Sequence, residues 1–230
     1  MPHYPLFLSL TNRQVVIIGA GAVGKRKLQT LLLYAPEKIV LVDPLLADEA
    51  MAEPLRQTVA ASAKEQSVCL VPAPFAPEHL DGALLVFVAT DNPALNSQIA
   101  TLCKERGILC NLADSEEQSD FIVPASIMHG PLAVALSTGG LSPALAKKLR
   151  QEIEILLGSG YSELAELMGR LRPKVLALGL PSEARANLFR SLVYSPLASL
   201  LEKGDMTGVS ELLHALLPEQ LHSCVHEVLQ

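Results

Sequence analysis

A glycine-rich loop is the segment of this sequence whose spacing most directly suggests chemistry. Gly19, Gly21 and Gly24 follow the apolar run Val15–Ile18 and open an amphipathic stretch. In a strand–loop–helix unit, the first glycine permits a tight turn, the second lets the backbone approach a pyrophosphate, and the third allows close helix–strand packing. Free N–H groups at the start of the helix attract phosphates. We therefore predict a dinucleotide site at Gly19, Gly21, Ala22, Val23 and Gly24, the alternative being a turn that binds nothing.

An acidic residue after the second apolar run indicates which dinucleotide is bound. Asp43 ends the run Lys38–Val42 and lies nineteen positions after Gly24. A carboxylate at this place accepts hydrogen bonds from the adenosine ribose and repels a 2′-phosphate, so NAD is favoured over NADP. Pro44 is expected beside it at the cofactor. The alternative is that Asp43 caps the turn that begins with Pro44.

The fourth apolar run, Leu84–Ala89, ends in Thr90, Asp91 and Asn92. Ligands of open α/β sheets bind outside the carboxyl ends of the strands. Thr90 is therefore predicted on the nicotinamide side of the cofactor, whereas Asp91 and Asn92 either join the site or cap the next helix.

Three consecutive basic residues follow the glycine loop. Lys25, Arg26 and Lys27 lie in the first turns of the expected helix, where cations oppose the helix dipole. Either a bound anion offsets this conflict or the three side chains form a solvated face.

Alternating strands and helices must position these residues. Short continuous apolar runs are typical of parallel strands buried on both faces. We expect strands at Val15–Ile18, Ile39–Val42, Val68–Val71, Leu84–Ala89 and Ile108–Leu112, and helices at about 23–34, 48–65 and 93–106. This order predicts a Rossmann-type, doubly wound α/β sheet.

The pattern changes after Asp114. Phe121–Ile127 and Leu132–Ser137 resemble two strands joined by a turn, and Ser142-Pro143 opens a helix, after which the chain is helical throughout. We predict an NAD-binding Rossmann domain at 1–113, a small β dimerisation segment at 114–142 and an all-helical domain at 143–230. Two strands alone are marginally stable, so a homodimer through the β segment is a reasonable hypothesis.

Composition excludes several classes of function. The net charge of −6 lacks the basic surplus of a nucleic-acid binder, and no apolar run approaches the length needed to cross a bilayer. The four cysteines have no paired spacing, which indicates a reduced, cytoplasmic protein. His222 and His226 lack a third ligand, so we expect no metal site.

Several motifs, in order along the chain, resemble the precorrin-2 dehydrogenase family, the N-terminal module of siroheme synthases. They are Tyr4-Pro5-Leu6-Phe7-Leu8, the glycine loop with Arg26-Lys27, Ala89-Thr90-Asp91 with Asn96, Cys110-Asn111-Leu112-Ala113-Asp114, Phe121-Ile122-Val123-Pro124-Ala125 and Ser137-Thr138-Gly139-Gly140-Leu141-Ser142-Pro143. The resemblance implies NAD-dependent oxidation of precorrin-2 to sirohydrochlorin in siroheme (tetrapyrrole) biosynthesis. Some members also insert ferrous iron, so iron is a possible second substrate and ferrochelatase activity stays open.

The resemblance also implies site residues. The family's key aspartate falls on Asp114, which would take a proton from the macrocycle. Asn111 at the same strand end would orient the substrate, and Ser137 would lie at the substrate pocket. A substrate rich in carboxylates needs cations, for which Arg150 is our choice because arginine binds carboxylates bidentately.

Two alternative hypotheses about the function stay open. One is an NAD-binding, ligand-sensing regulatory module without catalysis, which would need neither Asp114 nor the Ser-Thr-Gly-Gly segment. The other is a dehydrogenase of a different pathway, which would need a histidine or lysine near the nicotinamide.

Overall fold

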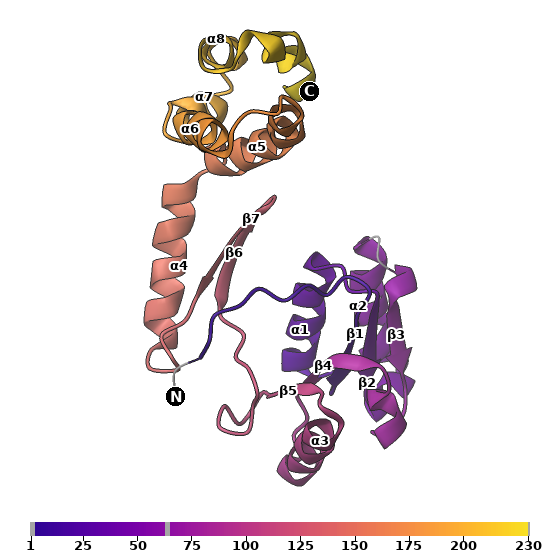
Figure 1. Ribbon diagram of the computed structural model, residues 1–230. Helices are drawn as coiled ribbons and strands as arrows, with labels where there is room; N and C mark the ends of the chain where they lie inside the picture. The colour runs from indigo at the N-terminus through magenta and orange to yellow at the C-terminus, as the bar shows by residue number, and fades with distance from the viewer. Residues whose placement is uncertain (1–2, 63–64, 230) are drawn as a thin grey trace. The chain divides into compact units, whose positions relative to one another are not determined.

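A computed structural model describes residues 3–62 and 65–229 and divides the chain into two compact units, residues 1–123 and 124–230 (Figure 1). The sequence predicts three parts with a first boundary at 113, so the observed division differs in two respects. The first unit extends ten residues further, and the β segment and the helices form one unit.

The first unit is built on a parallel sheet of five strands in the order β3-β2-β1-β4-β5, which confirms the predicted Rossmann-type fold. The strands are β1 (Gln14–Ile18), β2 (Lys38–Val42), β3 (Val68–Val71), β4 (Ala83–Val88) and β5 (Leu109–Leu112). In the register, Ile18 lies between Val42 and Val88. The strands therefore end together, and the residues that follow them share one edge of the sheet.

Helices cover both faces of this sheet. Helices α1 (Ala22–Leu33) and α2 (Glu49–Ala61) pack with Val15 and Ile17 on one face. Helix α3 (Pro93–Arg106) packs with Val16 and Ile18 on the other. Adjacent strand residues thus enter opposite cores, because side chains alternate along a strand. The two edge strands depart from the expected burial: the residues of β3 are partly exposed, and Leu109 of β5 is exposed.

Short 3-10 segments complete the unit at η1 (Pro44–Ala47), η2 (Glu65–Ser67) and η3 (Pro77–Leu80). The predicted second helix ends at Ala61, earlier than expected. Residues 63 and 64, within that predicted helix, lie outside the described residues.

The segment after β5 stays with the first unit because it is bonded to the outer edge of that strand. Asp120 N–H donates to the Cys110 carbonyl at 2.8 Å, and Cys110 N–H donates to Asp120 Oδ2 at 2.9 Å. Leu112 N–H donates to Ser119 Oγ at 2.9 Å. Phe121 packs edge-on against Phe87. These bonds explain why the strand predicted at 121–127 begins only at Ala125.

The second unit joins a strand pair to a group of helices. Strands β6 (Ala125–His129) and β7 (Leu132–Leu136) are antiparallel, as predicted. They pack against α4 (Pro143–Leu157), and β7 also contacts α5 (Gly160–Ala177). The remaining helical segments are α6 (Ser182–Val193), α7 (Leu197–Glu202), α8 (Met206–Leu216), η4 (Glu219–Cys224) and α9 (Val225–Val228). An aliphatic core from α5 to α9 holds these helices together.

Two features relate to the environment of the protein. In the described part of the chain, no helix combines the length and the apolar character that crossing a membrane requires. All four cysteines lie in that part, and none is in a disulfide. The cytoplasmic location stays a prediction.

Candidate active site

Two glycines of the loop are required by packing. Gly19 has φ +103°, and its N–H donates to the Val42 carbonyl at 2.9 Å. A Cβ at Gly19 would collide with the Ala89 carbonyl, and a Cβ at Gly24 would collide with the carbonyl of Gly19. These close contacts hold the ends of β2 and β4 and the start of α1 against the loop that follows β1.

The middle glycine is open instead of packed. A Cβ at Gly21 would meet no atom within 4 Å, and Gly21 is exposed at the start of α1. No side chain caps this helix, and its first turn contains no acidic residue. Uncapped N–H groups at a helix start, with a partial positive charge, suit a phosphate. The loop consequently fits a dinucleotide pyrophosphate, with the amides of Ala22 and Val23 among the candidate donors.

Asp43 lies beside the loop and already has two partners. Its Oδ2 accepts from Ala20 N–H at 2.6 Å, and its Oδ1 accepts from Leu45 N–H at 2.8 Å. The second bond caps the 3-10 turn that begins with Pro44. Each carboxylate oxygen can accept a further bond, so the predicted contact with a ribose, for which Pro44 would be the neighbour, stays a prediction.

A buried amide connects the ends of β4 and β5. Asn96 on α3 is 1% exposed, and its Nδ2 donates to Asp114 Oδ2 at 3.0 Å and to the Thr90 carbonyl at 3.2 Å. The Thr90 hydroxyl donates to Asn96 Oδ1 at 2.5 Å. The structure thus brings Thr90 and Asp114, both predicted from sequence, together through Asn96. From the sequence, Asn96 is only one residue of a family motif, without a predicted role of its own.

Two further residues at this edge have local bonds. Asn92 accepts from Ala94 and Leu95 N–H groups at 3.1 and 3.2 Å, so it caps α3. Asn111 Nδ2 donates to the Phe121 carbonyl at 2.9 Å, which fixes the segment after β5. The predicted role of Asn111 in orienting a substrate is not tested by this bond.

The other predicted residues belong to the second unit. The exposed Ser137 accepts from Gly139 N–H at 3.0 Å, and Arg150 on α4 pairs with Glu154 at 2.7 Å. Their contact with a substrate stays a prediction.

Three family models match the chain one after another. They are described as putative NAD(P)-binding (residues 6–125), sirohaem biosynthesis protein central (129–155) and sirohaem synthase dimerisation region (160–217). The first alone covers more than half of the chain. The chain belongs to the sirohaem synthase family.

Sirohaem synthase relatives match almost all of this chain but less than half of their own length. Siroheme synthase 1 of Aeromonas salmonicida (strain A449) is 34% identical over 221 residues, which are 96% of this chain and 45% of the relative. Siroheme synthase of Azotobacter vinelandii (strain DJ / ATCC BAA-1303) is 35% identical over 229 residues, which are 99% of this chain and 47% of the relative.

A solved structure titled "SirC, precorrin-2 dehydrogenase" has the same fold. Its TM-score is 0.68 at 20% identity, covering 91% of this chain and all of that one. At this identity the likeness shows the fold alone, and it agrees with the sheet, strand pair and helices described above.

In this member of the sirohaem synthase family, Lys25 and Lys27 after the loop are half buried, and Lys27 lies over an aromatic ring. Lys27 Nζ lies 4.9 Å from the centre of the Phe87 ring. Desolvation by burial, and then repulsion from Arg26, lower the pKa of Lys27 from its ordinary value. Burial makes the charge costly, so a bound anion remains one explanation for its presence.

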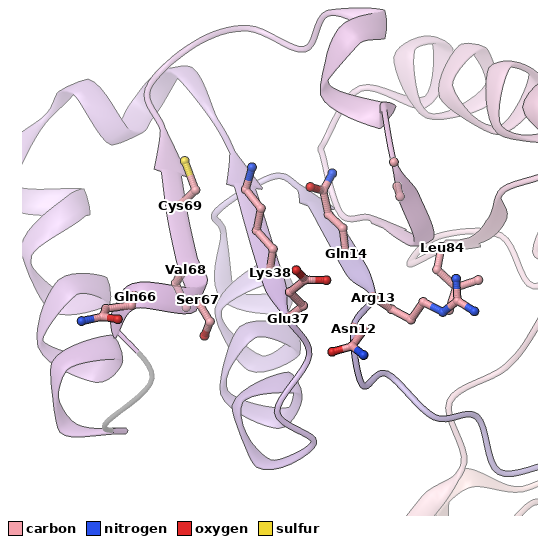
Figure 2. Close-up of a pocket in the computed structure, with 12 residues that line it drawn as sticks. Asn12, Arg13, Gln14, Glu37, Lys38, Gln66, Ser67, Val68, Cys69 and Leu84 are labelled. Carbon is pink, nitrogen blue, oxygen red and sulfur yellow. The ribbon is translucent and has the colours of Figure 1, made fainter.

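A cavity of about 530 Å³ lies at the amino ends of the strands, on the edge opposite to the glycine loop (Figure 2). Gln14, Lys38 and Cys69 line it from three neighbouring strands (Figure 2). The carboxyl edge of this sirohaem synthase family member is nevertheless the better candidate for the active site. It alone combines the open helix start with Asp43, Thr90 and Asp114.

Proposed function

We propose that this chain oxidises precorrin-2 to sirohydrochlorin with NAD as hydride acceptor. The observation that carries the proposal is the place of Asp114. This carboxylate follows β5 at the same sheet edge as the glycine loop, and a buried amide holds one of its oxygens. Membership of the sirohaem synthase family supplies the substrate class.

The residues of the chain divide the work of a dehydrogenation between them. NAD, when bound, supplies the hydride acceptor. The loop amides at Gly21, Ala22 and Val23 hold the pyrophosphate, and Asp43 selects an unphosphorylated ribose. Asp114 accepts the proton that the macrocycle loses as its C–H hydride leaves.

The second unit supports a homodimer as the working form. Helix α4 and the turn before it carry exposed large apolar side chains: Leu141, Leu145, Leu149, Ile155 and Leu156. Apolar surface of this extent commonly marks a protein interface. The family model described as a dimerisation region matches residues 160–217, which follow this surface in the chain, and it supports the homodimer without including these side chains. Sedimentation analysis should show a dimer at micromolar concentration, whereas a monomer at all concentrations would contradict it.

Turnover by the purified chain tests the proposed activity. The protein is incubated anaerobically with precorrin-2 and NAD, while NADH and sirohydrochlorin absorbance are followed. We expect Asp114→Ala to lower kcat by about 10²–10⁴-fold, the usual contribution of a positioned acid or base. Glu117→Gln, an exposed carboxyl change in the following loop, is the matched control.

Two other outcomes have separate meanings. NAD binding without any turnover would favour the ligand-sensing module over the enzyme. Ferrous iron added after the oxidation tests for insertion, since a siroheme spectrum that depends on the protein would add ferrochelatase activity.

A further inference from the structure

Asn96 is unusual because it is the one polar side chain that is buried among the described residues. A primary amide brings two donor hydrogens and one acceptor oxygen into the core. Burying such a group is unfavourable unless these positions are bonded. The hydrogen-bond partners of the Asn96 amide therefore indicate the role of this residue.

The bonds of Asn96 fix the direction of its amide. The oxygen accepts from the Thr90 hydroxyl, and the two N–H groups are directed at the Thr90 carbonyl and at Asp114 Oδ2. A flipped amide would set its oxygen against a carbonyl and a carboxylate, which cannot donate when ionised. Asp114 is thus held by a donor at Oδ2. Its Oδ1 has no hydrogen bond to the residues described.

We propose that Asn96 is a positioning residue that acts through Asp114. It fixes Oδ2 by a hydrogen bond and thereby directs the free oxygen, Oδ1, toward the proton to be removed. This inference rests on the proposed function. An exposed carboxylate on a loop samples several rotamers, and a displacement of about 1 Å can cost 10²-fold in rate.

The opposing hypothesis is that Asn96 only joins β4, α3 and the loop after β5. The two hypotheses differ in how they couple to Asp114. A positioning residue loses its effect on rate when its partner is absent, whereas an independent structural residue does not.

Four variants separate the two hypotheses. Asn96→Asp keeps the size and the acceptor for Thr90 but cannot donate to an ionised Asp114. Asn96→Leu is similar in size and removes all the bonds. The double variant Asn96→Leu/Asp114→Ala completes a double-mutant cycle. Ser97→Ala, a change at the exposed neighbour of Asn96 on α3, is the control.

We expect each Asn96 variant to lower kcat by about 10–100-fold, with KM for precorrin-2 and Kd for NAD within threefold of the parent. The double variant should be no slower than Asp114→Ala alone. Multiplying losses in the double variant, or an unchanged kcat in both single variants, would overturn the proposal. Circular dichroism melting checks that each variant is folded. If Asn96→Leu does not fold, Thr90→Val takes its place. It removes the hydroxyl that donates to Asn96 Oδ1 and accepts from Asn92 N–H at 3.2 Å, and it should lower kcat with the same dependence on Asp114.

A second measurement needs no turnover. In the proton–nitrogen spectrum of the parent protein, both amide protons of Asn96 should exchange slowly with solvent. Asp114→Ala should speed the exchange of one and leave the other slow. Equal exchange before and after would contradict the bond on which the inference depends. If the parent makes no NADH, the proposed function fails, and this measurement still decides whether Asn96 holds Asp114.

Discussion

The two edges of the parallel sheet have the same strands and opposite characters. At the carboxyl edge, Gly19 and Gly24 are packed against backbone carbonyls, and Asp43 and Asn96 are bonded to neighbouring elements. At the amino edge, a cavity of about 530 Å³ is lined by exposed side chains such as Lys38 and Cys69 (Figure 2). A hollow in the surface and a site that can do chemistry are therefore at different places in this unit.

The difference shows that functional residues gathered at one edge of the sheet identify the candidate site better than a hollow in the surface does. All strands in a parallel sheet point the same way, so the helix starts and loop residues that follow them gather at one edge. The opposite edge receives helix ends and the residues before the strands. A cavity there can be large without any aligned donors for a ligand.

The largest expected difference between the edges concerns their glycines. Gly24→Ala at the carboxyl edge places a methyl group onto a backbone carbonyl, so we expect loss of NAD binding and several kcal/mol of stability. Gly82→Ala at the amino edge meets no atom within 4 Å and has only a positive φ to oppose, at a cost of about 1–2 kcal/mol. Urea unfolding and NAD titration measure both variants. Equal losses would remove the distinction.

A charge comparison is expected to give the next largest effect. Asp43→Asn should weaken NAD binding by about tenfold, as expected for the loss of a charged hydrogen-bond acceptor at the ribose. It should also narrow the preference for NAD over NADP, because the repulsion of a 2′-phosphate disappears. The matched change at the amino edge, Glu37→Gln, should leave both affinities unchanged. Isothermal titration with the two cofactors decides, and an unaltered preference in Asp43→Asn would mean that Asp43 only caps its turn.

Substituting Lys27 should have a smaller effect, which is a change in how the free energy of unfolding depends on pH. Because burial lowers the pKa of this lysine in the folded state, the unfolded chain holds more protons as the pH rises toward 10.5, and folding gains stability over that range. Lys27→Met removes the desolvated charge, so it should raise the free energy of unfolding at pH 7 and flatten its increase toward pH 10. Denaturation at the two pH values tests this, with Lys25→Met as control. A less stable variant would show that the contact with Phe87 outweighs the desolvation.

The smallest expected effect is at the cavity. Exchanging Arg13 and Lys38 for alanine together removes two cations from its lining and should change NAD affinity and kcat by less than twofold. Both side chains are exposed and lie at the sheet edge opposite to the glycine loop, so their loss should not reach the cofactor. A loss of tenfold or more in either quantity would show that the amino edge also takes part in the function.

Local signals in the sequence predict much of this fold. The bounds of α3 were predicted correctly because Asn92 caps its start, Pro93 opens it, and Gly107 with φ +67° ends it. The apolar runs predict all five parallel strands. The start of β6 was wrong because Phe121 is held by Asn111 and Phe87, contacts that no local pattern encodes.

The candidate site was predictable in its positions and not in its connections. Glycine spacing and strand ends indicate Gly21, Asp43 and Thr90. The bond from Asn96 to Asp114 spans eighteen positions and crosses from a helix to a loop. Only the packing of α3 against the ends of β4 and β5 brings these residues together, which explains why the sequence does not show the role of Asn96.

The segment after β5 affects how readily the protein aggregates at high concentration. Unpaired N–H and C=O groups on an outer strand are a template onto which a strand from another chain can add. Here the outward groups of Cys110 and Leu112 are already taken by Asp120 and Ser119. Two side chains and one backbone amide thus occupy the places that an added strand would need, and the sheet is protected on that side against aggregation.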